Sequence, residues 1–379
     1  MNSEGLKKST AVIWSHTGLR GLAAMYVVLY HFLGGGATPD RDGLHRFFYF
    51  GGYAVDLFFI LSGFILNWVY LSNAQTMNWP AYWRARAARI LPLYYLTTLL
   101  AIPGFVRSNA STPGLGAHGY LVDCIWNVFL FSGAMDGWHS TFNGPAWSIS
   151  VEFFCYLALF PWLVWLHGRL SVKPNKLWFF GILAGLFTGG LVVSYGIRPI
   201  PIWHWHWDCS WLMRGISGFS AGFCLGSIHR ESSRWKPGFG VINLAVLTPI
   251  SILILVGFGF LPAWLGLCVL PILVLFSAKD RGVASNLLQM KFFQWLGDRS
   301  YSIYLWHVII LGSYTGFLRG RYSQPACFVV EMFLILGVSE LSYRFFECPF
   351  REYIRKFPRP FPSCRFNPPG RPGGIVGRG

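Results

Sequence analysis

Charged residues are scarce in this sequence, and acidic ones are the scarcest. Only 12% of the 379 residues are charged, Asp and Glu together number 15, and 54% of the residues are hydrophobic. A soluble globular chain carries about 25% charged residues, so this composition excludes an ordinary soluble domain. We therefore expect most of the surface to face lipid.

The sequence also lacks recognisable metal-binding and nucleic-acid-binding motifs. Its eight cysteines show no Cys-x-x-Cys spacing, which argues against a zinc site or a disulfide framework. The net charge of +16 comes with no recognition helix or RNA-binding motif. His204 and His206 alternate with tryptophan and have no third ligand at suitable spacing, so we interpret them as part of an aromatic belt. We expect no metal, no nucleic acid and no permanently bound cofactor.

Apolar runs, in contrast, are abundant and have the length that crosses a bilayer, about 20 residues. The first has no small-residue cleavage site after it, so we expect it to remain as a membrane anchor. The run at 120–131 is too short to cross and is expected at the membrane interface or as a partly buried helix. The fold class predicted is all-α, a polytopic transmembrane bundle of about ten spans, at residues 18–33, 51–71, 90–106, 147–166, 177–196, 210–228, 240–257, 260–277, 299–317 and 325–346.

Lys and Arg residues concentrate in alternate loops and predict the orientation. Positive loops face the cytoplasm, which places both termini inside. The opposite loops hold few basic residues: Arg41, Arg46, Arg107, Arg198, Arg319 and Arg321. We expect a cytoplasmic segment at 1–16, a transmembrane domain at 17–352, and a Pro/Gly/Arg-rich cytoplasmic tail at 353–379 that is disordered.

Several ionisable residues lie inside apolar runs, where each costs about 2.5 to 3.5 kcal/mol unless it is paired or functional. Arg20 and His31 are eleven residues apart, which returns to within about 20° of the same helix face and separates them by about 16 Å. Asp56 and Glu152 each lie about one turn below the surface opposite the cytoplasm. The pattern predicts that His31, Asp56 and Glu152 meet at one level of the bilayer.

Three arginines, Arg84, Arg86 and Arg89, occupy the predicted loop before the third span. Guanidinium groups hold phosphates with two hydrogen bonds at once, so the cluster suits a phosphate-bearing ligand. The alternative is a topology signal that contacts lipid head groups.

These segments resemble the acyltransferase-3 family of membrane O-acyltransferases, which modify bacterial O-antigens and exopolysaccharides. The resemblance runs from about residue 15 to 352, with Ile149 where the family usually has Leu. Six motifs carry it in order: GLRGLAAMYVVLYHF at 18–32, GGYAVDLFFILSGFIL at 51–66, YWRARAARILPLYYL at 82–96, PAWSISVEFFCYLALFP at 145–161, WLGDRSYSIYLWHVII at 295–310, and Glu-Cys-Pro at 347–349.

The resemblance implies an O-acyltransferase in a bacterial inner membrane that takes acyl-CoA, usually acetyl-CoA, as its co-substrate. It implies that His31 is catalytic, that Arg20 is required on the donor side, and that Arg84 and Arg86 contact the donor. A neutral imidazole suits a general base for a sugar hydroxyl, and Asp56 or Glu152 would fix its tautomer. Four further residues are expected to line the cavity: Trp147, Ser148, Tyr301 and His307.

The acceptor expected from the resemblance is an extracytoplasmic glycan or glycolipid. Two alternatives stay open at this point. One is acylation of a small secondary metabolite, and the other is a transporter or flippase of an anionic lipid-linked sugar, in which the buried acids and His31 relay protons. The sequence has no internal repeat of the kind many transporters show.

Overall fold

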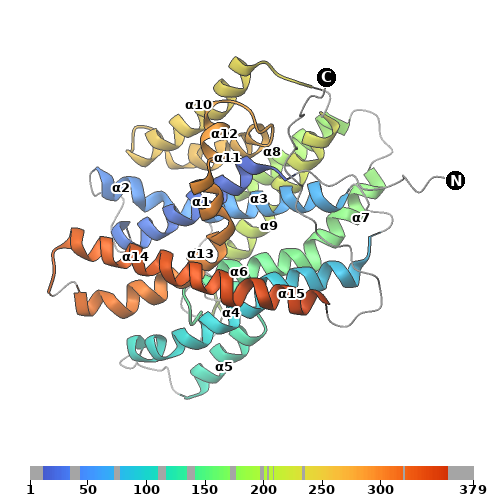
Figure 1. Cartoon of the computed structure of the whole chain (residues 1–379). Coiled ribbons are helices and arrows are strands. Elements are labelled where there is room, and N and C mark those ends of the chain that lie inside the picture. Colours follow the sequence, from blue (N-terminus) through green and yellow to red (C-terminus); the bar gives the residue numbers. More distant parts are fainter. Residues whose placement is uncertain are drawn as a thin grey trace, which may run out of the picture.

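The chain folds into a bundle of helices in a computed structural model (Figure 1). The structure describes residues 12–34, 43–71, 77–109, 117–134, 141–170, 176–196, 200–202, 205–207, 209–232, 235–318 and 321–356. The predicted N-terminal segment and C-terminal tail therefore lie mostly outside the described residues.

The first half of the chain forms α1 (Trp14–Leu29), η1 (Tyr30–Gly34), α2 (Leu44–Tyr49), η2 (Phe50–Gly52), α3 (Tyr53–Tyr70), α4 (Trp79–Asn109), α5 (Ala117–Val128), η4 (Ser132–Ala134), α6 (Ala146–Phe154), η5 (Cys155–Leu159), α7 (Phe160–Leu170) and α8 (Lys176–Ser194). The second half forms β1 (Ile200–Ile202), β2 (Trp205–Trp207), α9 (Cys209–Glu231), α10 (Phe239–Gly257), α11 (Ala263–Ser277), α12 (Val283–Leu288), α13 (Lys291–Leu318), α14 (Gln324–Ser342), η6 (Tyr343–Glu347) and α15 (Cys348–Lys356).

Each predicted span coincides with a helix, because hydrophobic runs of this length satisfy their backbone hydrogen bonds internally. Among the residues that the structure describes, six helical stretches are long and apolar enough to cross a membrane: 44–70, 79–107, 146–169, 177–194, 239–257 and 324–356. The total of ten and the location of the termini remain predictions. The short run near residue 120 forms α5, a helix of 12 residues.

Two closely packed helix pairs form the centre of the bundle, α1 with α13 and α3 with α9. In both pairs, glycine residues at the contact allow the two backbones to approach closely. A Cβ atom at Gly63 would lie 1.9 Å from the Phe219 carbonyl oxygen, and one at Gly297 would lie 2.0 Å from the Thr17 carbonyl oxygen. Small residues let helix backbones approach closely enough for dispersion contacts to hold them together in lipid. Ala24, on α1, is fully buried.

The start of α1 is capped from elsewhere in the chain. The Asp280 carboxylate, after α11, accepts hydrogen bonds from the backbone amides of Trp14 (3.1 Å) and Ser15 (2.8 Å). A carboxylate there satisfies amides that have no intrahelical partner and complements the helix dipole. The cap ties the start of α1, the helix that carries Arg20, to the segment after α11.

In the described part of the chain, three short π-helical turns interrupt the helices beside the sequence motifs. The η1 turn contains His31, η5 begins three residues after Glu152, and η6 contains Glu347. A π-turn rotates the residues after it relative to a regular helix, and such turns are frequent at functional sites.

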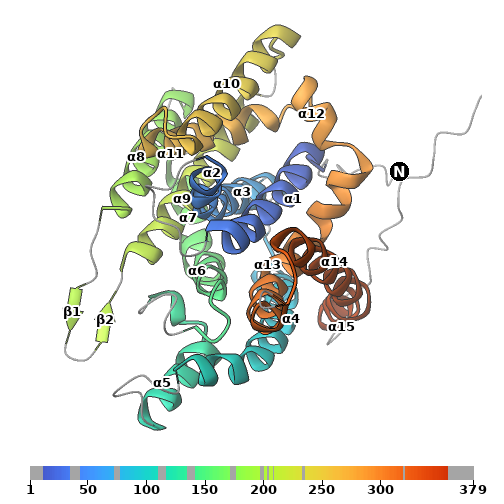
Figure 2. The same ribbon diagram turned by 90° about the vertical axis from the view of Figure 1, so that its left-hand side faces the viewer.

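The remaining helices surround this centre. In Figures 1 and 2, α10 and α11 lie to one side of α1 and α3, and α4, α13 and α15 lie to the other, with α5 at the edge beyond α4. The described residues confirm the all-α prediction, with one small addition. The chain between α8 and α9 forms a two-stranded antiparallel hairpin of β1 and β2, drawn apart from the helices in Figure 2.

Candidate active site

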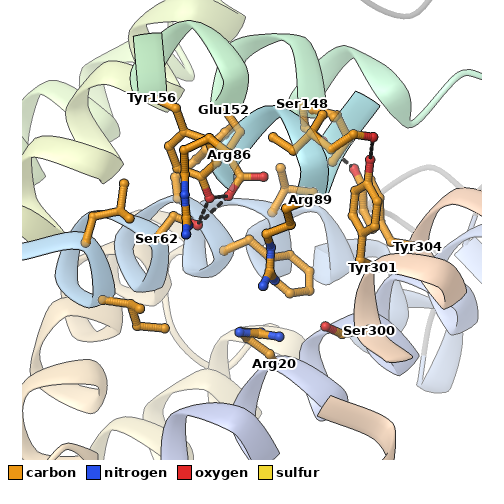
Figure 3. Close-up of a pocket in the computed structure, with 17 residues that line it drawn as sticks. Arg20, Ser62, Arg86, Arg89, Ser148, Glu152, Tyr156, Ser300, Tyr301 and Tyr304 are labelled. Atoms are coloured by element: carbon orange, nitrogen blue, oxygen red, sulfur yellow. Dashed lines mark hydrogen bonds between the residues drawn. The ribbon is translucent and has the colours of Figure 1, made fainter. Parts of the chain in front are cut away.

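A small cavity of about 80 Å³ lies between α1, α3, α4, α6 and α13. We call it the arginine cavity, because three guanidinium groups line it (Figure 3). Its polar lining comprises Arg20, Ser62, Arg86, Arg89, Ser148, Glu152, Tyr156, Ser300, Tyr301 and Tyr304. One carboxylate among three guanidinium groups leaves the lining cationic, which suits an anionic ligand.

The arginines reach the cavity from two walls. Arg20 extends from α1 and donates to the Gly297 carbonyl oxygen at 3.1 Å. Arg89 extends from α4 toward Arg20, as Figure 3 shows. Arg86, also on α4, donates to the Tyr70 hydroxyl at 3.3 Å, and its guanidinium lies 5.7 Å from the Tyr156 ring centre.

The structure corrects the prediction of an arginine loop. α4 begins at Trp79, so the three arginines are helical. Residues three apart share a helix face, and residues two apart do not. Arg86 and Arg89 therefore line the cavity together, whereas Arg84 is not among its lining residues.

Glu152 lies in the arginine cavity and not at the level of His31. Its carboxylate accepts hydrogen bonds from the Ser62 hydroxyl and from the Tyr156 hydroxyl, the latter at 2.5 Å. The prediction of one shared level for His31, Asp56 and Glu152 is therefore wrong. α6 begins at Ala146, so Glu152 lies about 9 Å along the helix from its start, and Ser62 lies a similar distance along α3 beyond Asp56.

A second and wider pocket, of about 680 Å³, contains His31. We call it the histidine pocket. Aromatic rings and a guanidinium dominate its lining, which includes Tyr30, Tyr49, Tyr53, Trp147, Tyr195, Trp211 and Arg214. Large aromatic faces with a few polar groups are typical of small-molecule sites.

Asp56 is bound by a partner that the sequence analysis did not assign. Its carboxylate accepts two hydrogen bonds from Arg214, at 3.0 and 3.1 Å, and a third from the Tyr195 hydroxyl. The Asp56 side chain is fully buried, and that of Arg214 is 9% exposed. The Arg214 guanidinium also lies against the rings of Trp147 and Tyr195, at 5.2 and 4.5 Å from their centres. This arrangement identifies Asp56 as half of a buried ion pair beneath the histidine pocket.

Val55 and Tyr304 line both cavities, and we call this shared wall the junction. The Tyr304 hydroxyl donates to the Pro145 carbonyl oxygen at 3.0 Å and lies 2.7 Å from the Ser148 hydroxyl. These bonds fix the Tyr304 ring at the junction. The junction therefore has the guanidinium groups of the arginine cavity on one side and the His31 imidazole on the other.

The expected cavity-lining residues divide between the two sites. Ser148 and Tyr301 line the arginine cavity, and Trp147 lines the histidine pocket. His307 lines neither cavity. It is fully buried, and its Nε2 lies 3.2 Å from Nδ1 of His31.

Sequence reasoning missed the roles of Arg214, Tyr195 and Tyr156. Arg214 carried a usable signal, since it is a charged residue within an apolar run and needs a partner. The tyrosines gave none, because Tyr is common near membrane boundaries. Among the described residues, no group of three His, Cys, Asp or Glu side chains is arranged to hold a metal ion.

Comparisons with known proteins identify a family for most of the chain. A family model described as an acyltransferase domain matches residues 14–343. The acyltransferase MdmB of Streptomyces mycarofaciens is 29% identical over 196 residues, which cover 49% of this chain and 47% of that protein.

Two further relatives match over most of this chain. The peptidoglycan O-acetyltransferase OatA of Listeria monocytogenes is 24% identical over 88% of this chain and 55% of its own length. The O-acetyltransferase OatA of Staphylococcus aureus is 24% identical over 88% of this chain and 56% of its own length. The chain thus spans about half the length of these curated relatives. No solved structure was found to match it.

Proposed function

Because this chain belongs to the acyltransferase-domain family, we propose that it is a membrane-embedded O-acyltransferase. It transfers an acyl group, acetyl in the simplest case, from cytoplasmic acyl-CoA to a hydroxyl of an extracytoplasmic glycan or glycolipid. The single observation that supports this most is the junction at Val55 and Tyr304, the wall that the arginine cavity and the histidine pocket share.

The charge and the size of the arginine cavity support coenzyme A as the donor. Coenzyme A is polyanionic at its nucleotide end, and its thioester lies at the end of a long, thin arm. Arg20, Arg86 and Arg89 offer cationic, planar donors for phosphates at one side of the junction. A cavity of only about 80 Å³ favours a thin, extended arm over a folded ligand.

In the proposed reaction, His31 acts as the base from the histidine pocket, on the other side of the junction. The acceptor hydroxyl attacks the thioester carbonyl carbon while the His31 imidazole takes its proton. A C–O bond forms, the C–S bond breaks, and the proton passes from His31 to the departing thiolate. His31 returns to its neutral form, so no permanently bound cofactor takes part.

The relatives support a glycan as acceptor, since one is named as a peptidoglycan O-acetyltransferase. The aromatic rings of the histidine pocket suit the apolar face of a sugar ring, and its volume of about 680 Å³ admits a small oligosaccharide. The similarity to MdmB, a Streptomyces acyltransferase, keeps a small-metabolite acceptor as the second candidate.

Membrane vesicles that contain the protein test the function. With radiolabelled acetyl-CoA on the cytoplasmic face, we expect label in the glycan or glycolipid fraction without any ion gradient. A gradient requirement with no transfer of label would favour the transporter alternative. Mass spectrometry of envelope glycans and of secreted metabolites, with and without the protein, then separates the two acceptors.

The role of His31 is tested by His31→Ala. We expect acetyl-CoA binding to persist and turnover to fall by about two to four orders of magnitude, the usual cost of losing a positioned base. His167→Ala is the matched control, because His167 lines neither cavity. Near-normal turnover in His31→Ala would refute the mechanism, and a loss of donor binding would make His31 a binding residue.

The proposed location is a bacterial inner membrane, with both termini cytoplasmic. Cysteines engineered at Gly137 and Lys173 test the orientation, since the two positions flank one predicted span. A membrane-impermeant thiol reagent added outside intact cells should label position 137 and spare position 173. The reverse pattern would overturn the orientation.

A further inference from the structure

His307 is buried directly behind the proposed base. It lies on α13, one turn after Tyr304, and none of its surface is exposed. Its Nδ1 lies 2.6 Å from the Tyr304 carbonyl oxygen, and its Nε2 lies 3.2 Å from Nδ1 of His31. Nδ1 of His31 also lies 3.0 Å from the Val27 carbonyl oxygen.

The positions of the hydrogen atoms on the two imidazoles can be assigned from the acceptors that surround them. A carbonyl oxygen only accepts, so Nδ1 of His307 carries the hydrogen that points to Tyr304. A neutral imidazole has one N–H, which leaves a lone pair on Nε2 of His307. That lone pair and the Val27 carbonyl oxygen both face Nδ1 of His31. Two acceptors around one nitrogen place the hydrogen of His31 on Nδ1 and leave the lone pair on Nε2.

We propose that His307 is a positioning residue that holds His31 in the tautomer whose Nε2 is the base. This inference rests on the proposed function. His307 does for His31 what a carboxylate does in a hydrolytic triad, the role that the sequence analysis gave to Asp56 or Glu152. When Nε2 takes the proton of the acceptor hydroxyl, the Nδ1–H···Nε2 bond to His307 becomes charge-assisted and stabilises the imidazolium.

Two variants of His307 separate positioning from packing. His307→Leu removes the acceptor and keeps an apolar side chain of similar size. We expect kcat to fall by about 10- to 100-fold, with KM for acetyl-CoA and acetyl-CoA binding unchanged. The loss is smaller than that of a triad acid, about 10⁴-fold, because the Val27 carbonyl still faces Nδ1. His307→Gln carries a carbonyl oxygen that can reach the place of Nε2, and we expect it to recover most of kcat.

Equal losses in His307→Leu and His307→Gln, or a rise in KM alone, would show that His307 only fills space. A double variant adds a second criterion. If His307 acts through His31, adding His307→Leu to His31→Ala should cost no further turnover. A multiplicative loss would overturn the proposal.

The tautomer itself can be observed by ¹⁵N NMR of the protein labelled at histidine, with the His31 signals assigned by comparison with His31→Ala. We expect a protonated Nδ1 and an unprotonated Nε2 for His31, and a mixture of tautomers in His307→Leu. The reverse tautomer in the unmodified protein would refute the inference even if His31 is essential. Loss of the His31 requirement would instead refute the proposed function.

Discussion

The buried Asp56–Arg214 pair offers a direct test of structure against chemistry. Asp56→Asn keeps the shape of the side chain and removes its charge, so Arg214 stays buried without a counter-ion. Breaking a buried pair by neutralising one partner costs about 3 to 5 kcal/mol. The pair satisfies the conditions for this cost, because Asp56 is fully buried and Arg214 is 9% exposed.

The double variant Asp56→Leu with Arg214→Met removes both charges and replaces them with apolar side chains. Such replacements are often neutral or stabilising, so we expect it to recover most of the lost stability. The free energy of unfolding in mixed micelles, followed by tryptophan fluorescence against added SDS, measures all variants. Asp298→Asn is the control, since this exposed aspartate on α13 should change stability by less than about 0.5 kcal/mol.

Turnover distinguishes a structural role of Asp56, as the ion-pair partner of Arg214, from a role in the chemistry. If it is a structural partner, activity per folded molecule should survive Asp56→Asn far better than His31→Ala. Unchanged stability together with an activity loss as large as that of His31→Ala would refute the ion-pair interpretation. Asp56 would then belong to the chemistry, as the sequence analysis expected.

Three further outcomes follow from particular contacts. Arg86→Ala should raise the Kd for acetyl-CoA at least tenfold in a binding assay, because a charge-assisted hydrogen bond contributes about 1.5 to 3 kcal/mol. An equal effect of Arg84→Ala would contradict the assignment of Arg86, and not Arg84, to the cavity. Gly63→Ala should abolish folded protein in size-exclusion chromatography, since its Cβ would lie 1.9 Å from a carbonyl oxygen of α9. Gly104→Ala, which meets open space, should behave normally. Asp280→Ala should lower unfolding stability by about 0.5 to 2 kcal/mol through loss of the α1 cap; no change would mean that other groups satisfy those amides.

Local sequence patterns were sufficient for the helices and for several of the site residues. Hydropathy and the helical period act over about 20 residues, so each apolar run predicted a helix in the right place. The cost of an ion in hydrocarbon also indicated that Arg20, Asp56 and Glu152 face protein, and all three do. The same test would have identified Arg214.

The pairing of these residues depended on contacts between distant helices. Asp56 meets Arg214 across 158 residues, and His31 meets His307 across 276. Depth in the bilayer did not predict either pair, because a π-turn rotates the residues that follow it, and the true start of a helix sets how far along the axis each residue lies. The helical start of α4 likewise decided which arginines face the cavity.

The sequence by itself thus determined which segments become helices and which charged side chains must avoid lipid, since both depend on the free energy of a single segment in its solvent. The tertiary structure alone decided which acid, arginine and imidazole touch. That choice depends on where glycine contacts let two helices cross. The sequence of one helix does not specify which other helix packs against it.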